Sequence, residues 1–221
     1  MAYIKDCHAP LWRPKLWSKL NDIPILENTN CYSYAFNYVD YREKKLQPGE
    51  ISNNIEVSSY TCENFHKKLK EDYPEILLSN ENENFKDCSR YKIALFIDTM
   101  EGNEDYHFYR QDANGNWSHK PGSNDVTNLD ASCSIIKNPE KADRNYRETN
   151  KQKNKGCDNE DNNRVDNGDD NEGDNEGDNE EDDRVDNGED NGGDNSNSHN
   201  YSTFCNYYSL PVKEGPIIRI V

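Results

Sequence analysis

The sequence predicts an α+β fold in which helices pack on an antiparallel sheet. Three stretches lead to this prediction. Residues 62–73 have the apolar spacing of an amphipathic helix, residues 91–98 form a short apolar run rich in β-branched and aromatic side chains, and residues 105–119 have the pattern of a β-hairpin. The chain has 221 residues, enough for one domain or at most two.

A first helix is predicted to begin at Cys31 and to run to about Tyr41. Thr29 or Asn30 can cap this helix, because either side-chain oxygen can accept a hydrogen bond from the first N–H groups. The same N–H groups favour negative charge, so they stabilise a thiolate at Cys31 and make it a nucleophile. The alternative is that Cys31 is a small buried hydrophobic residue, as many cysteines are.

A second helix is predicted over residues 62–73. Phe65, Leu69 and Tyr73 recur at helical spacing and form an apolar stripe, while lysines occupy the other side. His66 lies beside this stripe and is predicted to be a surface residue.

The hairpin over residues 105–119 is informative because its turn defines its register. The sequence Asp112-Ala113-Asn114-Gly115 matches a type I turn followed by a glycine in the left-handed region. With residues 113–115 as the loop, residue 109 faces 119 and residue 107 faces 121. His107 and His119 then point to the same face of the sheet, roughly 7 to 8 Å apart at the backbone. A two-residue Asn-Gly turn would instead place them on opposite faces.

Charge divides the chain into two parts. Between residues 158 and 194 there are 18 acidic residues and two arginines, a net charge of −16, whereas the rest of the chain has a net charge of −1. We predict a disordered acidic insertion over 148–199, rich in Asp, Asn, Gly and Glu, within a single domain formed by 1–147 and 200–221. Residues 201–208 are predicted to form a last strand of that domain. No basic patch indicates nucleic-acid binding.

The seven cysteines are scattered and include no C-x-x-C pair. This spacing predicts neither a zinc site nor a disulfide framework, and it favours a reducing compartment. No apolar run has the length of a membrane span or of a signal-peptide core. We therefore expect an intracellular protein with no membrane association, no metal and no cofactor.

Three segments carry a family resemblance, namely Asn30-Cys31-Tyr32-x-Tyr34-Ala35, Asp105-Tyr106-His107-Phe108-Tyr109-Arg110 and Trp117-Ser118-His119-Lys120-Pro121-Gly122. Together they resemble the NlpC-type branch of papain-like cysteine peptidases. In that family the cysteine begins a helix packed on an antiparallel sheet, the base histidine lies on a hairpin strand, and a third polar residue follows about a dozen positions later. The pattern is also similar to uncharacterised papain-like proteins of large DNA viruses and bacilli, for which host cytoplasm or the virion is the expected location.

The resemblance implies that Cys31 is the nucleophile, His107 the general base and His119 the residue that orients His107. Asp112, Asn124 or Asp125 could orient His107 instead. The usual Asp-Cys-x-Gly of the family is Asn30-Cys31-Tyr32-Ser33 here, so its specificity for peptidoglycan peptides does not carry over.

The sequence thus predicts a cysteine-dependent amide hydrolase that acts on a peptide or another amide. The backbone N–H of Cys31 would help to stabilise the oxyanion. Two alternatives remain open. A thiol acyltransferase would use the same residues, and a catalytically inactive binding or structural protein would use its acidic insertion to contact basic partner proteins.

Overall fold

A central five-stranded sheet organises the chain. The computed structural model describes residues 10–20, 23–40, 45–52, 56–85, 89–149, 199–212 and 217–219. The predicted acidic insertion, apart from its two ends, lies outside these residues. The strand order is β4-β8-β5-β6-β7, and every pairing in this sheet is antiparallel. The strands are β4 (Leu77–Ser79), β5 (Arg90–Asp98), β6 (Asp105–Gln111), β7 (Trp117–Ser118) and β8 (Thr203–Pro211).

Smaller elements surround this sheet. The helices are η1 (Pro14–Trp17, a 3₁₀-helix), α1 (Cys31–Ala35), α2 (Cys62–Asp72) and α3 (Tyr146–Thr149). Two further sheets have two strands each: β1 (Lys19–Leu20) pairs antiparallel with β2 (Ile23–Pro24), and β3 (Tyr38–Asp40) pairs parallel with β9 (Ile217–Arg219). The α+β class is therefore confirmed.

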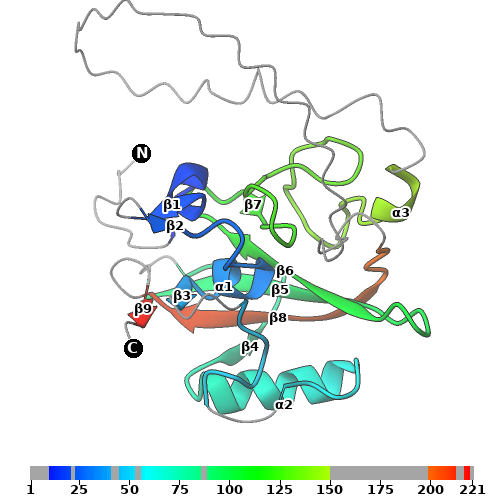
Figure 1. The fold of residues 1–221 in the computed structure, drawn as a ribbon, viewed down its shortest axis with the longest axis horizontal. Helices are drawn as coiled ribbons and strands as arrows, with labels where there is room; N and C mark the ends of the chain where they lie inside the picture. The colour runs from blue at the N-terminus through cyan, green and yellow to red at the C-terminus, as the bar shows by residue number, and fades with distance from the viewer. Residues whose placement is uncertain are drawn as a thin grey trace, which may run out of the picture.

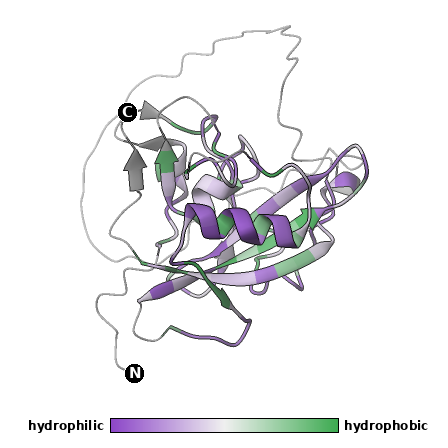
Figure 2. Cartoon of the chain, turned by 90° about the horizontal axis from the view of Figure 1, so that it is seen from below, coloured by the Kyte–Doolittle hydropathy of each residue, from purple (hydrophilic) through white to green (hydrophobic). Residues whose placement is uncertain are grey.

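Both faces of the central sheet are covered. In Figure 1, α2 lies on one side of β5, β6 and β8, and the segment from β7 to α3 lies on the other. Residues 91–98 are all buried, which explains why β5 has a continuous apolar run instead of an alternating pattern. Figure 2 shows the contrast between this hydrophobic strand region and the hydrophilic outer side of α2. On α2 the stripe of Phe65 and Leu69 is buried, as predicted.

A strand is confirmed where the last one was predicted, as β8, and it is central; it is not the last, because β9 follows it. It pairs with β5 along nearly its whole length and with β4 on its other side. The chain on the far side of the acidic stretch therefore contributes an interior strand to the sheet formed by the residues before it.

The predicted hairpin is also confirmed. Gly115 has a φ of 87° and its N–H donates to the carbonyl of Asp112, as expected for a type I turn followed by a left-handed glycine. Pairing of Arg110 with Ser118 and of Gln111 with Trp117 gives the predicted register. His107 and His119 accordingly project from the same face.

The first helix is shorter than predicted. Asn30 is its cap, and its side-chain oxygen accepts a hydrogen bond from the Ser33 N–H. The helix ends at Ala35 instead of continuing to about Tyr41, and Asn37 adopts a φ of 52°. The next residues form β3, which pairs with β9 from the far end of the chain. This long-range pairing, which local sequence does not reveal, overrides the helical continuation.

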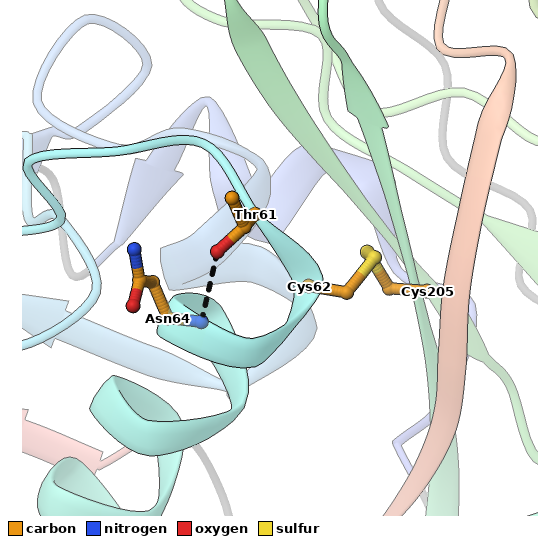
Figure 3. The surroundings of a disulfide bond; sticks show 4 residues. All are labelled: Thr61, Cys62, Asn64 and Cys205. Atoms are coloured by element: carbon orange, nitrogen blue, oxygen red, sulfur yellow. Dashed lines mark hydrogen bonds between the residues drawn. A yellow bond between two sulfur atoms is a disulfide. The ribbon is translucent and has the colours of Figure 1, made fainter.

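The prediction that the cysteines form no disulfides was wrong. Cys62, in the first turn of α2, is bonded to Cys205 on β8, with 5.2 Å between the Cα atoms (Figure 3). Cys133 is disulfide-bonded as well. Cys62 and Cys205 are 143 positions apart, so only the packing of α2 on the sheet brings them together. The surface prediction for His66 was also wrong, because its ring is half-buried and stacks on Tyr208.

Candidate active site

Cys31 lies where α1 meets the outer edge of β6. Its side chain is 5% exposed, and its Sγ is 3.9 Å from the carbonyl oxygen of Tyr106. The described ladder between β6 and β7 spans Arg110 and Gln111, so β7 does not cover this part of the edge. Among the described cysteines, Cys31 is the one that keeps a thiol.

The two predicted histidines are in direct contact. Nε2 of His107 is 2.7 Å from Nδ1 of His119, and Nε2 of His119 is 2.9 Å from the carbonyl oxygen of Leu129. Because a carbonyl only accepts, Nε2 of His119 must carry a proton, and Nδ1 of a neutral His119 then accepts from Nε2–H of His107. This leaves Nδ1 of a neutral His107 without a proton. The chain of hydrogen bonds therefore selects the tautomer that a general base requires.

Burial keeps both histidines neutral. His107 is 2% exposed and His119 is fully buried. Burial lowers the pKa of His107 well below its usual value, and the neighbouring His119 and His199 lower it further. Burial also lowers the pKa of His119 to about 4, against the opposing effects of the Leu129 carbonyl and Asp130. At pH 7 both rings are thus neutral.

Tyrosine rings enclose the histidine pair. Tyr109 contacts both histidines, at 5.0 Å from His107 and 4.9 Å from His119 between ring centroids. Tyr201 stacks on His107, and Tyr146 packs against His119. Burial raises the pKa of Tyr109 and of Tyr201 well above the usual value, and the nearby charge of Cys31 adds to this in both cases. Cys31 itself packs in a separate hydrophobic cluster with Tyr106 and Phe108, and it interacts electrostatically with both tyrosines.

The other residues predicted as possible orienting groups have different partners. Asp112 is buried and forms an ion pair with Arg110 at 2.9 Å, and it also accepts a hydrogen bond from Ser118. Asp125 accepts a hydrogen bond from Ser18, and the N–H of Asn124 donates to the carbonyl of Pro121. His119 is the one of the four candidates that the structure places against the ring of His107.

Sequence reasoning missed the role of Lys120 in this region. Its side chain is fully buried, and Nζ donates to the carbonyl oxygens of Leu26, Thr29 and Gly122 at 2.7 to 2.9 Å. These bonds tie the segment before Cys31 to the segment that follows His119. Its position directly after His119 was the one sign in the sequence that Lys120 lies near the site. Its three carbonyl partners are brought to it only by the tertiary structure.

Tyr201 was also missed as a neighbour of the site. From the sequence, Tyr201 is predicted only as part of the last strand. In the structure it lies two residues before β8, close to the end of the acidic stretch, and it reaches His107 because β8 pairs with β5, which in turn pairs with β6. No spacing within the sequence relates it to His107.

Within the described residues, no cluster of His, Cys, Asp or Glu side chains has the arrangement of a metal site. None of the helices described is long and apolar enough to cross a membrane.

Comparison with known proteins gives one relative to report. Over 133 residues the chain is 34% identical to a protein named insoluble matrix shell protein 1 from Ruditapes philippinarum. The matched region is 60% of this chain and 80% of that protein. No family model matches the chain, and no solved structure matches it.

Proposed function

The chain belongs to the same family as insoluble matrix shell protein 1, and we propose that this member is a papain-like thiol hydrolase that cleaves amide bonds. Cys31 is the nucleophile, His107 the general base and His119 the residue that orients His107. The observation that carries this proposal is the hydrogen-bonded series from His107 through His119 to the Leu129 carbonyl. A buried series of this kind fixes the tautomer of a general base, and Cys31 at the start of α1 contacts the strand that carries His107, so the set supports nucleophilic catalysis.

The reaction follows from these roles. Sγ of Cys31 attacks the carbonyl carbon of the amide while its proton passes to Nδ1 of His107, and the backbone N–H of Cys31 helps to stabilise the oxyanion. The C–N bond then breaks, and His107 gives the proton to the departing amine. Water attacks the resulting thioester, His107 takes a proton from the water, and the carboxylic acid leaves as Sγ regains its proton.

The papain-like arrangement is supported by the position of the candidate residues. A capped helix begins with the cysteine, and that helix lies at the edge of the strand that carries the base. The third residue follows after one hairpin turn, on the next segment of an antiparallel sheet. The substrate class is a peptide or another amide, and an acyltransferase on the same residues differs only in whether water or an amine accepts the acyl group.

A second candidate function is that of a structural or binding protein on the same scaffold. The name of the relative, a matrix shell protein, favours this candidate. In this case the acidic stretch, with a net charge of −16 between residues 158 and 194, contacts basic proteins through charge attraction.

We propose an oxidising compartment on the basis of the disulfide. A bond between Cys62 and Cys205 supports an oxidising environment, in contrast to the reducing, intracellular one that the cysteine spacing favoured. The relative's name, which refers to a shell matrix, is consistent with this proposal.

The experiment that tests the hydrolase is alkylation of the native protein by iodoacetamide without reductant, with the labelled site identified by mass spectrometry. We expect labelling at Cys31 at pH 6.5. The His107→Ala variant should be labelled on the order of tenfold more slowly, because the proton acceptor is lost. His66→Ala, a histidine variant on α2, is the matched control and should be labelled at the wild-type rate.

Two results would contradict the hydrolase. One is equal labelling of the wild type and His107→Ala at pH 6.5. The other is that iodoacetamide labels Cys31 below pH 8 only after the protein is unfolded. Either result would favour the structural or binding protein over the hydrolase.

A further inference from the structure

Tyr201 covers one face of the His107 ring. The two ring centroids are 4.9 Å apart and the planes are inclined by 29°, so the contact is a stack. Tyr109 approaches His107 from another direction, edge-on at 74°. Tyr201 is 2% exposed and is part of the buried cluster on this face of the sheet. The base is therefore held between an aromatic face and an aromatic edge.

Tyr201 is itself fixed at several points. Its hydroxyl donates to Oδ2 of Asp105 at 2.5 Å, and Asp105 lies two residues before His107 on β6. Its N–H donates to the carbonyl of Arg144, and Nε of Arg144 donates to the carbonyl of Tyr201. His199 stacks on Tyr201 at 5.7 Å. Because the hydroxyl and the backbone of Tyr201 are both hydrogen-bonded, the ring has little freedom to turn.

A hydrogen bond to His119 alone does not define the orientation of His107. One bond at Nε2 fixes the position of that atom, but the ring can still tilt about the line that joins the two nitrogens. A flat ring stacked on its face opposes that tilt, and such contacts contribute about 0.5 to 1.5 kcal/mol beyond simple burial. The direction in which Nδ1 points then depends on the stacked ring.

We propose that Tyr201 is a positioning residue that holds His107 in the orientation required to take the proton of Cys31. This inference rests on the proposed hydrolase function. It also assigns a role to the segment directly after the acidic stretch, which is joined to the rest of the site by a bridge between Asn145 and Asn200 and by the bond from Tyr146 N–H to the His199 carbonyl.

The test compares substitutions of Tyr201 in the full chain by the rate of Cys31 alkylation with iodoacetamide at pH 6.5 and pH 8.5. Tyr201→Leu removes the ring and should lower the rate at pH 6.5 by about three- to tenfold, which corresponds to the loss of one stack. At pH 8.5 the rate should be nearly unchanged, because a thiol ionises there without help from a base. Tyr201→Phe keeps the ring and should restore the rate to within about twofold of wild type.

Tyr207→Leu is the matched control. It removes a buried tyrosine from the same cluster, but this ring packs on Trp117 and Phe204. The ratio of its rates at the two pH values should equal that of wild type. Tyr201→Met keeps most of the side-chain volume without a ring, and it takes the place of Tyr201→Leu if thermal unfolding shows that the leucine variant does not fold.

The outcomes separate the two proposals. If His107→Ala slows labelling but the Tyr201 variants have the same ratio of rates at the two pH values as wild type or Tyr207→Leu, the positioning role is refuted. The hydrolase then stands. If His107→Ala itself has no effect, the hydrolase fails and the role of Tyr201 fails with it. A loss at pH 6.5 in Tyr201→Leu or Tyr201→Met, restored in Tyr201→Phe, supports the positioning role.

Discussion

The buried His119 should make the fold sensitive to acid in a defined pH range. Its pKa is about 4 in the folded chain because of burial, whereas in the unfolded chain it has the ordinary value of about 6.5. Above pH 6.5 both states hold a neutral imidazole, and His119 does not affect stability. Between pH 6.5 and about 4 the unfolded chain binds a proton that the folded chain does not, so stability falls as the pH falls.

The size of this effect follows from the same two values. A pKa that drops from about 6.5 to about 4 corresponds to about 3 kcal/mol, at about 1.4 kcal/mol per pH unit. Most of this, roughly 2.5 kcal/mol, should be lost between pH 7 and pH 4.5. Below about pH 4 the penalty becomes constant, because His119 is then protonated in both states.

The assay is urea unfolding followed by tryptophan fluorescence at pH 7, 6, 5 and 4.5, for the wild type and for His119→Asn. Asparagine does not titrate, and its amide oxygen can still accept from Nε2–H of His107. The carboxylates and His107 are common to both proteins, so their contributions largely cancel in the difference. The wild type should lose roughly 2.5 kcal/mol more than the variant across this range. Parallel pH dependence of the two proteins would refute the reasoning, because His119 would then titrate normally in the folded chain.

Three further predictions concern the framework of the site. Replacing Cys62 and Cys205 by serine should lower the free energy of unfolding by about 2 to 5 kcal/mol, because the bond joins residues 143 positions apart; an unchanged urea midpoint would contradict this. Lys120→Met should cost about 3 kcal/mol in the same assay, since one buried and two partly buried carbonyls lose their donor. A melting temperature within 1 °C of wild type would argue against that role. Deleting residues 160–197 should leave the near-ultraviolet circular dichroism and the unfolding transition intact, because the free energy of loop closure depends weakly on loop length. Loss of the transition would show that the acidic stretch is needed for folding.

The hairpin shows how much of the candidate site local sequence could predict. The turn Asp112-Ala113-Asn114-Gly115 specifies the register, because Gly115 is suited to the left-handed conformation that this turn requires. The alternation of side chains along a strand then places His107 and His119 on one face. The cap at Asn30 is local in the same way, since it depends on a hydrogen bond to a residue three positions away.

Other features depend on contacts between distant parts of the chain. The first helix ends early because residues 38–40 pair with β9, and the disulfide forms because α2 packs beside β8. Lys120 reaches carbonyls more than 90 positions away. No periodicity or spacing in the sequence predicts these pairings, because each depends on which distant elements the folded sheet brings together.

The sequence by itself determined the α+β class, the hairpin register and the identity of Cys31, His107 and His119 as a candidate set, because turns, caps and strand alternation act over a few residues. Only the tertiary structure decided that the histidines are in contact and neutral, that Tyr201 stacks on His107 and that Cys62 and Cys205 are bonded. Burial and long-range packing produce these features, and the pairing of β8 with β5 is what brings Tyr201 and Cys205 to their partners.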